Sequence, residues 1–141
     1  MNLLRTFQML IVMIVSVTII AGCQGGSKKD TFPEVSDKLS ESIKQMDKHP
    51  GILLTGFAAD PKEKLYKVGI EYDPSQISSE QLKQIVIDYL SHAASNLSTP
   101  SSWEEMLKPF HLRIEKLGDA KKTPVIAEKD IGSTEIKWLF E

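Results

Sequence analysis

Residues 64–97 read KLYKVGIEYDPSQISSEQLKQIVIDYLSHAASNL and contain two different hydrophobic periodicities, one after the other. Over residues 64–72, apolar and polar side chains alternate, which is typical of a half-buried β-strand. From Leu82 onward, apolar residues recur at intervals of three and four, which gathers them on one face of an amphipathic helix. Ser78 and Gln81 have the spacing of a capping box in front of that helix. The stretch therefore predicts a strand followed by a helix.

The flanking segments extend this pattern on both sides. Upstream, the capping sequence Thr31–Glu34 predicts the start of another helix, which ends at Pro50. The uncharged run 52–59 predicts a strand that forms a β-hairpin with residues 64–72. Downstream, strands are predicted over residues 110–115, 125–129 and 134–141. We therefore predict an α+β domain with two layers, in which two main helices pack on one face of a mainly antiparallel sheet of four to five strands.

With both helices on one side, strand alternation divides the side chains between two faces of the sheet. The covered face is expected to hold apolar residues: Tyr66, Val68, Ile70, Phe110, Leu112, Ile114, Ile136 and Trp138. The open face is expected to hold charged residues: Lys67, Glu71, His111, Arg113, Glu115, Glu135 and Lys137. Leu53, Phe57 or Leu139 would join the open face, depending on the orientation of the first strand.

Composition and charge narrow the class of protein. The chain has 141 residues, of which 41% are hydrophobic, and this length favours a single domain. Its 17 basic and 19 acidic residues give a net charge of −2, which argues against a strongly basic nucleic-acid-binding protein. The single cysteine excludes an internal disulfide and a cysteine-based zinc cluster.

The first 23 residues have the pattern of a secretory signal. Arg5 is followed by the uncharged run Met9–Ile20. Twelve helical residues at about 1.5 Å each extend only ~18 Å, which is short of the ~30 Å hydrocarbon core of a membrane. A basic start, a short apolar stretch and small residues after it are typical of a cleaved signal peptide.

The small residues are more specific, because Ile20-Ala21-Gly22-Cys23 resembles the lipobox of bacterial lipoproteins. The usual form is Leu-Ala/Ser-Gly/Ala-Cys, and Ile replaces Leu here. The resemblance implies that residues 1–22 are a cleaved signal peptide and that Cys23 carries a diacylglyceryl group. Residues 23–30 would then form a lipidated flexible tether, and residues 31–141 the single α+β domain. It also implies a location at the extracytoplasmic face of the cell membrane.

A search for catalytic motifs finds no HExxH sequence, no Gly-x-Ser-x-Gly elbow and no phosphate-binding glycine loop. His92 follows Asp88 by four residues on the predicted helix, so the two side chains can meet. We interpret this pair as an ordinary helix ion pair. The alternative is a small envelope hydrolase with a site near Asp88 and His92. We predict no catalytic residues, no cofactor and no metal site.

The expected function is binding by a non-catalytic, lipid-anchored extracytoplasmic protein. An accessory factor and an inhibitory, immunity-type factor of the cell envelope remain alternatives, as does a small-ligand binder. The expected partners are the membrane, through lipidated Cys23, and an envelope protein, with no nucleic acid. The candidate interaction surface comprises Phe57, Trp103, Arg113 and Lys137. Trp103 either covers the edge of the core or presents an aromatic ring to a partner.

Overall fold

The computed structural model describes residues 29–118, 121 and 124–140. The predicted signal peptide and most of the predicted tether, Cys23 included, lie outside these residues. The helices are α2 (Phe32–Ser42), α3 (Lys44–Asp47), α4 (Ser79–Ser95) and α5 (Trp103–Leu107). The strands are β1 (Ile52–Asp60), β2 (Leu65–Tyr72), β3 (His111–Lys116), β4 (Val125–Lys129) and β5 (Lys137–Trp138).

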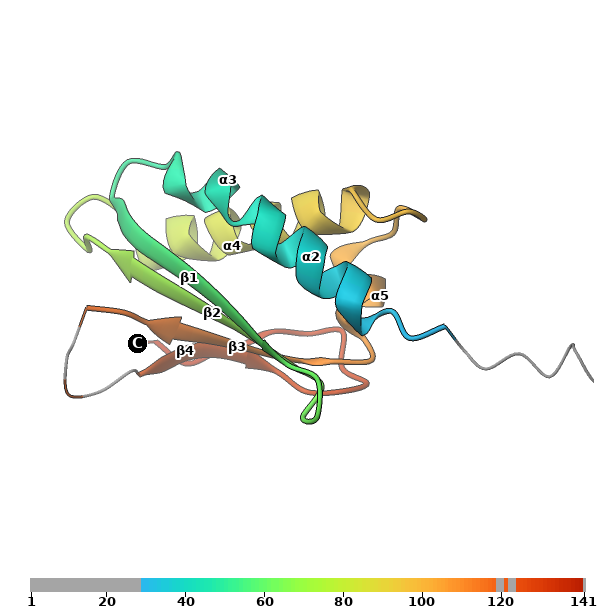
Figure 1. Ribbon diagram of the computed structural model, residues 1–141. Coiled ribbons are helices and arrows are strands. Elements are labelled where there is room, and N and C mark those ends of the chain that lie inside the picture. The colour runs from blue at the N-terminus through green and yellow to red at the C-terminus, as the bar shows by residue number, and fades with distance from the viewer. Residues whose placement is uncertain (1–28, 119–120, 122–123, 141) are drawn as a thin grey trace, which may run out of the picture. The chain divides into compact units, whose positions relative to one another are not determined.

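The five strands form one mixed sheet in the order β1-β2-β3-β4-β5, and α2, α3 and α4 lie on one side of it (Figure 1). β2 and β3 pair in parallel, whereas the other three pairs are antiparallel. The parallel pair arises because α4 and α5 connect β2 to β3, and parallel neighbours need such a crossover. The predicted α+β class, with helices on one face of a mainly antiparallel sheet, is confirmed.

Two predicted elements differ in detail. The N-terminal helix is divided into α2 and α3 at Ile43. Ile43 keeps helical dihedral angles (φ −59°, ψ −28°), so the apolar stripe continues through the division. The last strand is also shorter than the alternation over 134–141 predicts, because β5 has only two residues.

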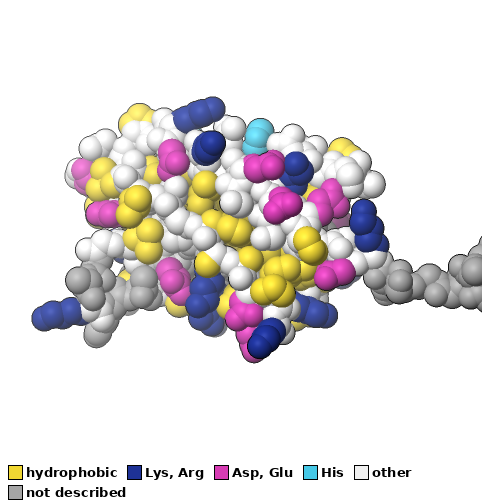
Figure 2. Space-filling model, in the orientation of Figure 1, with side chains coloured by type: hydrophobic (Ala, Val, Ile, Leu, Met, Phe, Trp, Pro, Cys, Tyr) yellow, Lys and Arg dark blue, Asp and Glu magenta, His cyan; other side chains and the backbone are white. Residues whose placement is uncertain are grey.

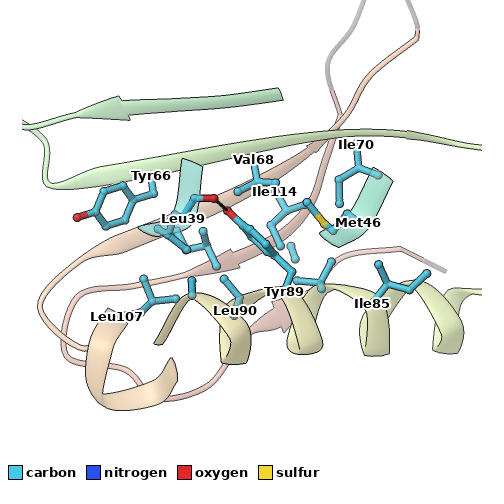
Figure 3. Close-up of a cluster of buried hydrophobic side chains, with 14 of the residues drawn as sticks. Leu39, Met46, Tyr66, Val68, Ile70, Ile85, Tyr89, Leu90, Leu107 and Ile114 are labelled. Carbon is cyan, nitrogen blue, oxygen red and sulfur yellow. Dashed lines mark hydrogen bonds between the residues drawn. The ribbon is translucent and has the colours of Figure 1, made fainter. Parts of the chain in front are cut away.

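The core lies between the helices and the covered face of the sheet, where apolar side chains from both layers meet (Figure 3). The expected covered-face residues of β2 and β3 are all buried: Tyr66, Val68, Ile70, Leu112 and Ile114. Phe110, just before β3, is buried as well, while Ile136 and Trp138 are partly buried against this core.

Two buried tyrosine hydroxyls attach α2 to the rest of the domain. Tyr66 of β2 donates a hydrogen bond to the Phe32 carbonyl oxygen at 2.8 Å. Tyr89 of α4 donates to the Leu39 carbonyl oxygen at 2.9 Å (Figure 3). Burial raises the pKa of the Tyr89 hydroxyl, so this group remains a protonated donor at physiological pH. Together the two bonds fix α2 against both the sheet and α4.

Candidate functional site

The open face of the sheet carries a row of charged side chains that crosses four strands. The register places Lys67 of β2 beside Arg113 of β3, and Arg113 beside Glu128 of β4. Glu128 is in turn opposite Lys137 of β5. Neighbours across strands share a face, so these four side chains lie together, opposite the buried core. We call Lys67, Arg113, Glu128 and Lys137 the charged row.

A depression of about 420 Å³ lies at one end of this face. It is lined by ten residues, seven of which are Asp, Glu, Lys or Arg: Asp60, Glu63, Leu65, Lys67, His111, Leu112, Arg113, Glu128, Lys129 and Asp130. At its side, His111 Nδ1 lies 3.6 Å from Asp130 Oδ1. In the described part of the chain, neither Lys67 nor Arg113 forms an ion pair. Both side chains are therefore available to an outside group.

The arrangement of charge indicates what kind of group could bind there. Lys67 and Arg113 are like-charged neighbours on adjacent strands, which is an unfavourable arrangement that a bound anion would relieve. The guanidinium of Arg113 can bind a carboxylate through two parallel hydrogen bonds. The same depression also holds four carboxylates, so its surroundings are not simply basic. A partner surface that carries both signs of charge fits it better than a free anion.

Lys129 also lines the depression, but its ammonium group has protein partners. The side chain is only 2% exposed. Its Nζ donates to the carbonyl oxygens of Asp130 and Ser133, at 2.7 and 2.9 Å. Burial lowers the pKa of Lys129, while the nearby charge of Asp130 acts in the opposite direction. Because Lys129 ties the end of β4 to the turn after it, we assign it a structural role.

Close packing on the open face is a feature that the sequence analysis missed. Gly56 of β1 and Gly69 of β2 are directly opposite each other. The side chain of Leu117 lies over Gly69, so that a Cβ atom added there would come within 2.8 Å of Leu117 Cδ1. It also reaches Gly56, at 3.9 Å from such an atom. Glycine inside a strand often marks a place where another part of the molecule comes close to the backbone. Gly56 and Gly69 were therefore the signal in the sequence that could have indicated this packing.

Apolar side chains are exposed at both edges of the sheet. Leu53 and Leu54 of β1 are 62% and 54% exposed, and Leu139 beyond β5 is 41% exposed. Figure 2 shows hydrophobic side chains gathered along the band that β1 and β2 occupy in Figure 1. Leu139 follows Trp138, which lies opposite buried Ala127, so the alternation places Leu139 on the open side. Leu53 lies at the register shift of β1, where the alternation assigns no face.

Two predicted surface residues lie elsewhere. Phe57 is opposite Val68, so it points to the covered face and stacks on Tyr66 with ring centroids 6.1 Å apart. Phe57 therefore lies on the covered face and not on the open face, because the orientation of β1 turns it inward. Trp103 is partly buried and packs against the core at the start of α5, so it covers the edge of the core. Arg113 and Lys137 do lie on the open face.

The predicted ion pair between Asp88 and His92 is not formed. Asp88 Oδ1 instead accepts a hydrogen bond from Gln84 Nε2 at 2.7 Å. His92 Nε2 lies 3.5 Å from Gln45 Nε2 of α3. A groove of about 360 Å³ reaches Asp88 but is not lined by His92. This groove thus does not bring together the two residues of the alternative hydrolase site.

Two further searches cover only the described residues. Within residues 29–118, 121 and 124–140, none of the helices has the length and hydrophobicity that a membrane span requires. In the same ranges, there is no group of three or more His, Cys, Asp or Glu side chains placed to hold a metal ion. Comparison of the chain with protein-family models, with curated proteins and with solved structures gives no match.

Proposed function

We propose that this chain is a lipid-anchored, extracytoplasmic binding protein that recognises a protein of the cell envelope through the open face of its sheet. The observation that carries the binding part is the charged row. Lys67 and Arg113 lie side by side over a depression of about 420 Å³ without an ion pair among the described residues. Such a surface suits a partner with complementary mixed charge.

The lipobox-like sequence at residues 20–23 supports the anchoring part of the proposal. Acyl chains contribute about 0.8 kcal/mol for each buried methylene group, so two or more of them hold a protein stably on a membrane. Replacement of Cys23 by Ser removes the thiol that accepts the lipid. We expect that Cys23→Ser abolishes incorporation of radiolabelled palmitate and blocks processing of the chain. Unchanged incorporation in this variant would disprove lipidation at Cys23.

The binding part is tested by comparing two double charge reversals in affinity capture from envelope extracts. The test variant is Arg113→Glu with Lys137→Glu, which reverses two cations of the charged row. The matched control is Lys44→Glu with Lys48→Glu, which makes the same change in charge at exposed positions in and just after α3. We expect the test variant to lose the proteins that the unmodified chain captures, and the control to retain them. Equal capture by both variants would contradict recognition through the open face.

A further inference from the structure

In the part of the chain that the structure describes, the outer edge of β1 is a long row of backbone groups with no strand beside it. β1 has nine residues and stands at one end of the sheet, where it pairs only with β2. At the opposite end, β5 has only two residues. Along the outer edge of an end strand, alternate N–H and C=O groups point away from the sheet and can accept another strand. Among the described residues, β1 therefore offers the longer edge for such pairing.

β1 has few of the features that keep a sheet edge from pairing, and they lie only at its two ends. Proteins protect such edges with charged side chains, proline, β-bulges or short strands. Residues 52–59 contain no charged residue and no proline. Leu53 and Leu54 expose 62% and 54% of their surface along this strand. The protecting features of β1 are a shift in the register with β2 between Ile52 and Leu54, at the start of the strand, and the charged residue Asp60 at its end.

We propose that this edge pairs in an antiparallel manner with β1 of a second copy of the chain, so that one sheet continues across both copies. The charges favour this partner. The uncharged run can lie against itself in any register without placing like charges opposite each other. The first charged side chains beyond its two ends are Lys48 and Asp60, which have opposite signs. Antiparallel pairing brings the Lys48 end of one strand toward the Asp60 end of the other.

The opposite edge also favours a closed pair over a longer assembly. Growth of a fibre would require each β1 edge to pair with a different edge of the next copy. β5 is too short to supply that edge, because it has two residues against the nine of β1. Pairing of identical edges about a two-fold axis closes after two copies. The edge contact is narrow compared with standard interfaces of roughly 1,600 Å², so the dimer should form mainly at high protein concentration.

The two-fold arrangement predicts a distinctive pattern of cross-links, and this test does not depend on the proposed envelope partner. Cysteine is introduced singly at each position from Leu53 to Ala58 of the purified full chain, and disulfide formation between copies is measured after oxidation. In an antiparallel pair, a residue faces its own copy only at the two-fold axis. A disulfide needs two Cα atoms roughly 4.4–6.8 Å apart. When a residue lies one position from the axis, it and the same residue of the second copy are already displaced from each other by about 6.6 Å along the strand, which is too far for a disulfide.

We therefore expect cross-linked dimer at one position, or at two adjacent ones, with loss of the product on either side. The unmodified chain, whose single cysteine is Cys23, is the reference for any cross-link at that residue. Equal cross-linking at all positions would indicate parallel stacking and would overturn the proposal. No cross-linking above the reference would also overturn it, since an edge covered by another segment or by a different protein gives that result.

A second pair of variants keeps the test independent of the introduced cysteines. Leu53→Lys with Leu54→Lys places charges on the edge at exposed positions, where the fold does not need the leucines. Leu139→Lys is the matched control, because Leu139 is also an exposed leucine but lies at the opposite edge. In the chain without introduced cysteines, we expect analytical ultracentrifugation at high protein concentration to show loss of the dimer in the first variant and its retention in the control. Equal dimer in both, with unchanged circular dichroism, would contradict pairing through β1.

Discussion

Leu112 and Arg113 are neighbours on β3, but they belong to two different environments. Leu112 is 1% exposed beneath the helices, in contact with a continuous apolar core. Arg113 lies on the open face, in a row of charged side chains across neighbouring strands. Side chains of the covered face stabilise the fold by burial, whereas cross-strand charge pairs contribute only about 0.2–1 kcal/mol each. The open face can therefore vary in sequence with little cost in stability, which leaves it available for recognition.

The sharpest test of this contrast is alanine substitution at the two adjacent positions. We expect Leu112→Ala to lower the free energy of unfolding by about 2–5 kcal/mol, because it leaves a cavity in the core. Arg113→Ala is expected to change that free energy by no more than about 0.5 kcal/mol. Urea denaturation followed by tryptophan fluorescence measures both values. If both variants lost a similar amount of unfolding free energy, Arg113 on the open face would stabilise the fold as much as the buried Leu112, which would contradict this contrast.

The next largest effect concerns the hydrogen bond that joins α4 to α2 inside the covered layer. Tyr89→Phe removes the hydroxyl that donates a buried hydrogen bond to the Leu39 carbonyl oxygen. We expect the free energy of unfolding to fall by about 0.5–1.5 kcal/mol, the net contribution of a typical hydrogen bond. Tyr72→Phe is a matched control, because Tyr72 is only partly buried at the end of β2. Equal effects of the two substitutions in thermal unfolding would argue against a stabilising role for the Tyr89 hydroxyl.

The open face has one close-packed region, and an effect of similar size is expected there. Gly69→Ala would place a Cβ atom within 2.8 Å of Leu117 Cδ1. Because Leu117 is flexible and only partly buried, we expect a loss of about 1 kcal/mol, near the lower limit for overpacking. In a Leu117→Ala background, the same substitution should be nearly neutral. A double-mutant cycle measures the difference, and additive effects would contradict the contact.

The alternation and helical periodicity of the sequence predict which side chains face each other across the two layers. Spacing alone predicts that Tyr66, Val68 and Ile70 lie on the covered face, and all three are buried. The spacing of apolar residues does not determine which strands become neighbours, because strand pairing depends on contacts between residues that are far apart in the sequence. The parallel pairing of β2 with β3 and the inward orientation of Phe57 are results of such contacts.

The same limit applies to the candidate site. The sequence predicts that Arg113 and Lys137 lie on the open face, since each follows the alternation of its strand. It does not predict that Glu128 lies between them, because β4 had to be placed beside both β3 and β5 first. The packing of Leu117 over the glycine pair was missed for a similar reason. Leu117 follows the end of β3, where a periodic pattern no longer indicates the direction of a side chain.

The smallest effect, and the one that distinguishes the two faces by mechanism, concerns the charge of Glu128. This residue lies between Arg113 and Lys137, so Glu128→Lys would make the whole charged row basic and create two like-charged cross-strand contacts. We expect a loss of up to about 1 kcal/mol in the free energy of unfolding, with a smaller loss for the neutral control Glu128→Gln. Exposed charges are screened over about 8 Å at 0.15 M salt and about 3 Å at 1 M, so the loss should largely disappear at high ionic strength. The loss caused by Leu112→Ala, which arises from packing, should persist in 1 M salt. Urea denaturation of the Glu128 variants at both salt concentrations measures this difference. If the loss for Glu128→Lys were the same at both concentrations, Glu128 would act through packing and not through its charge.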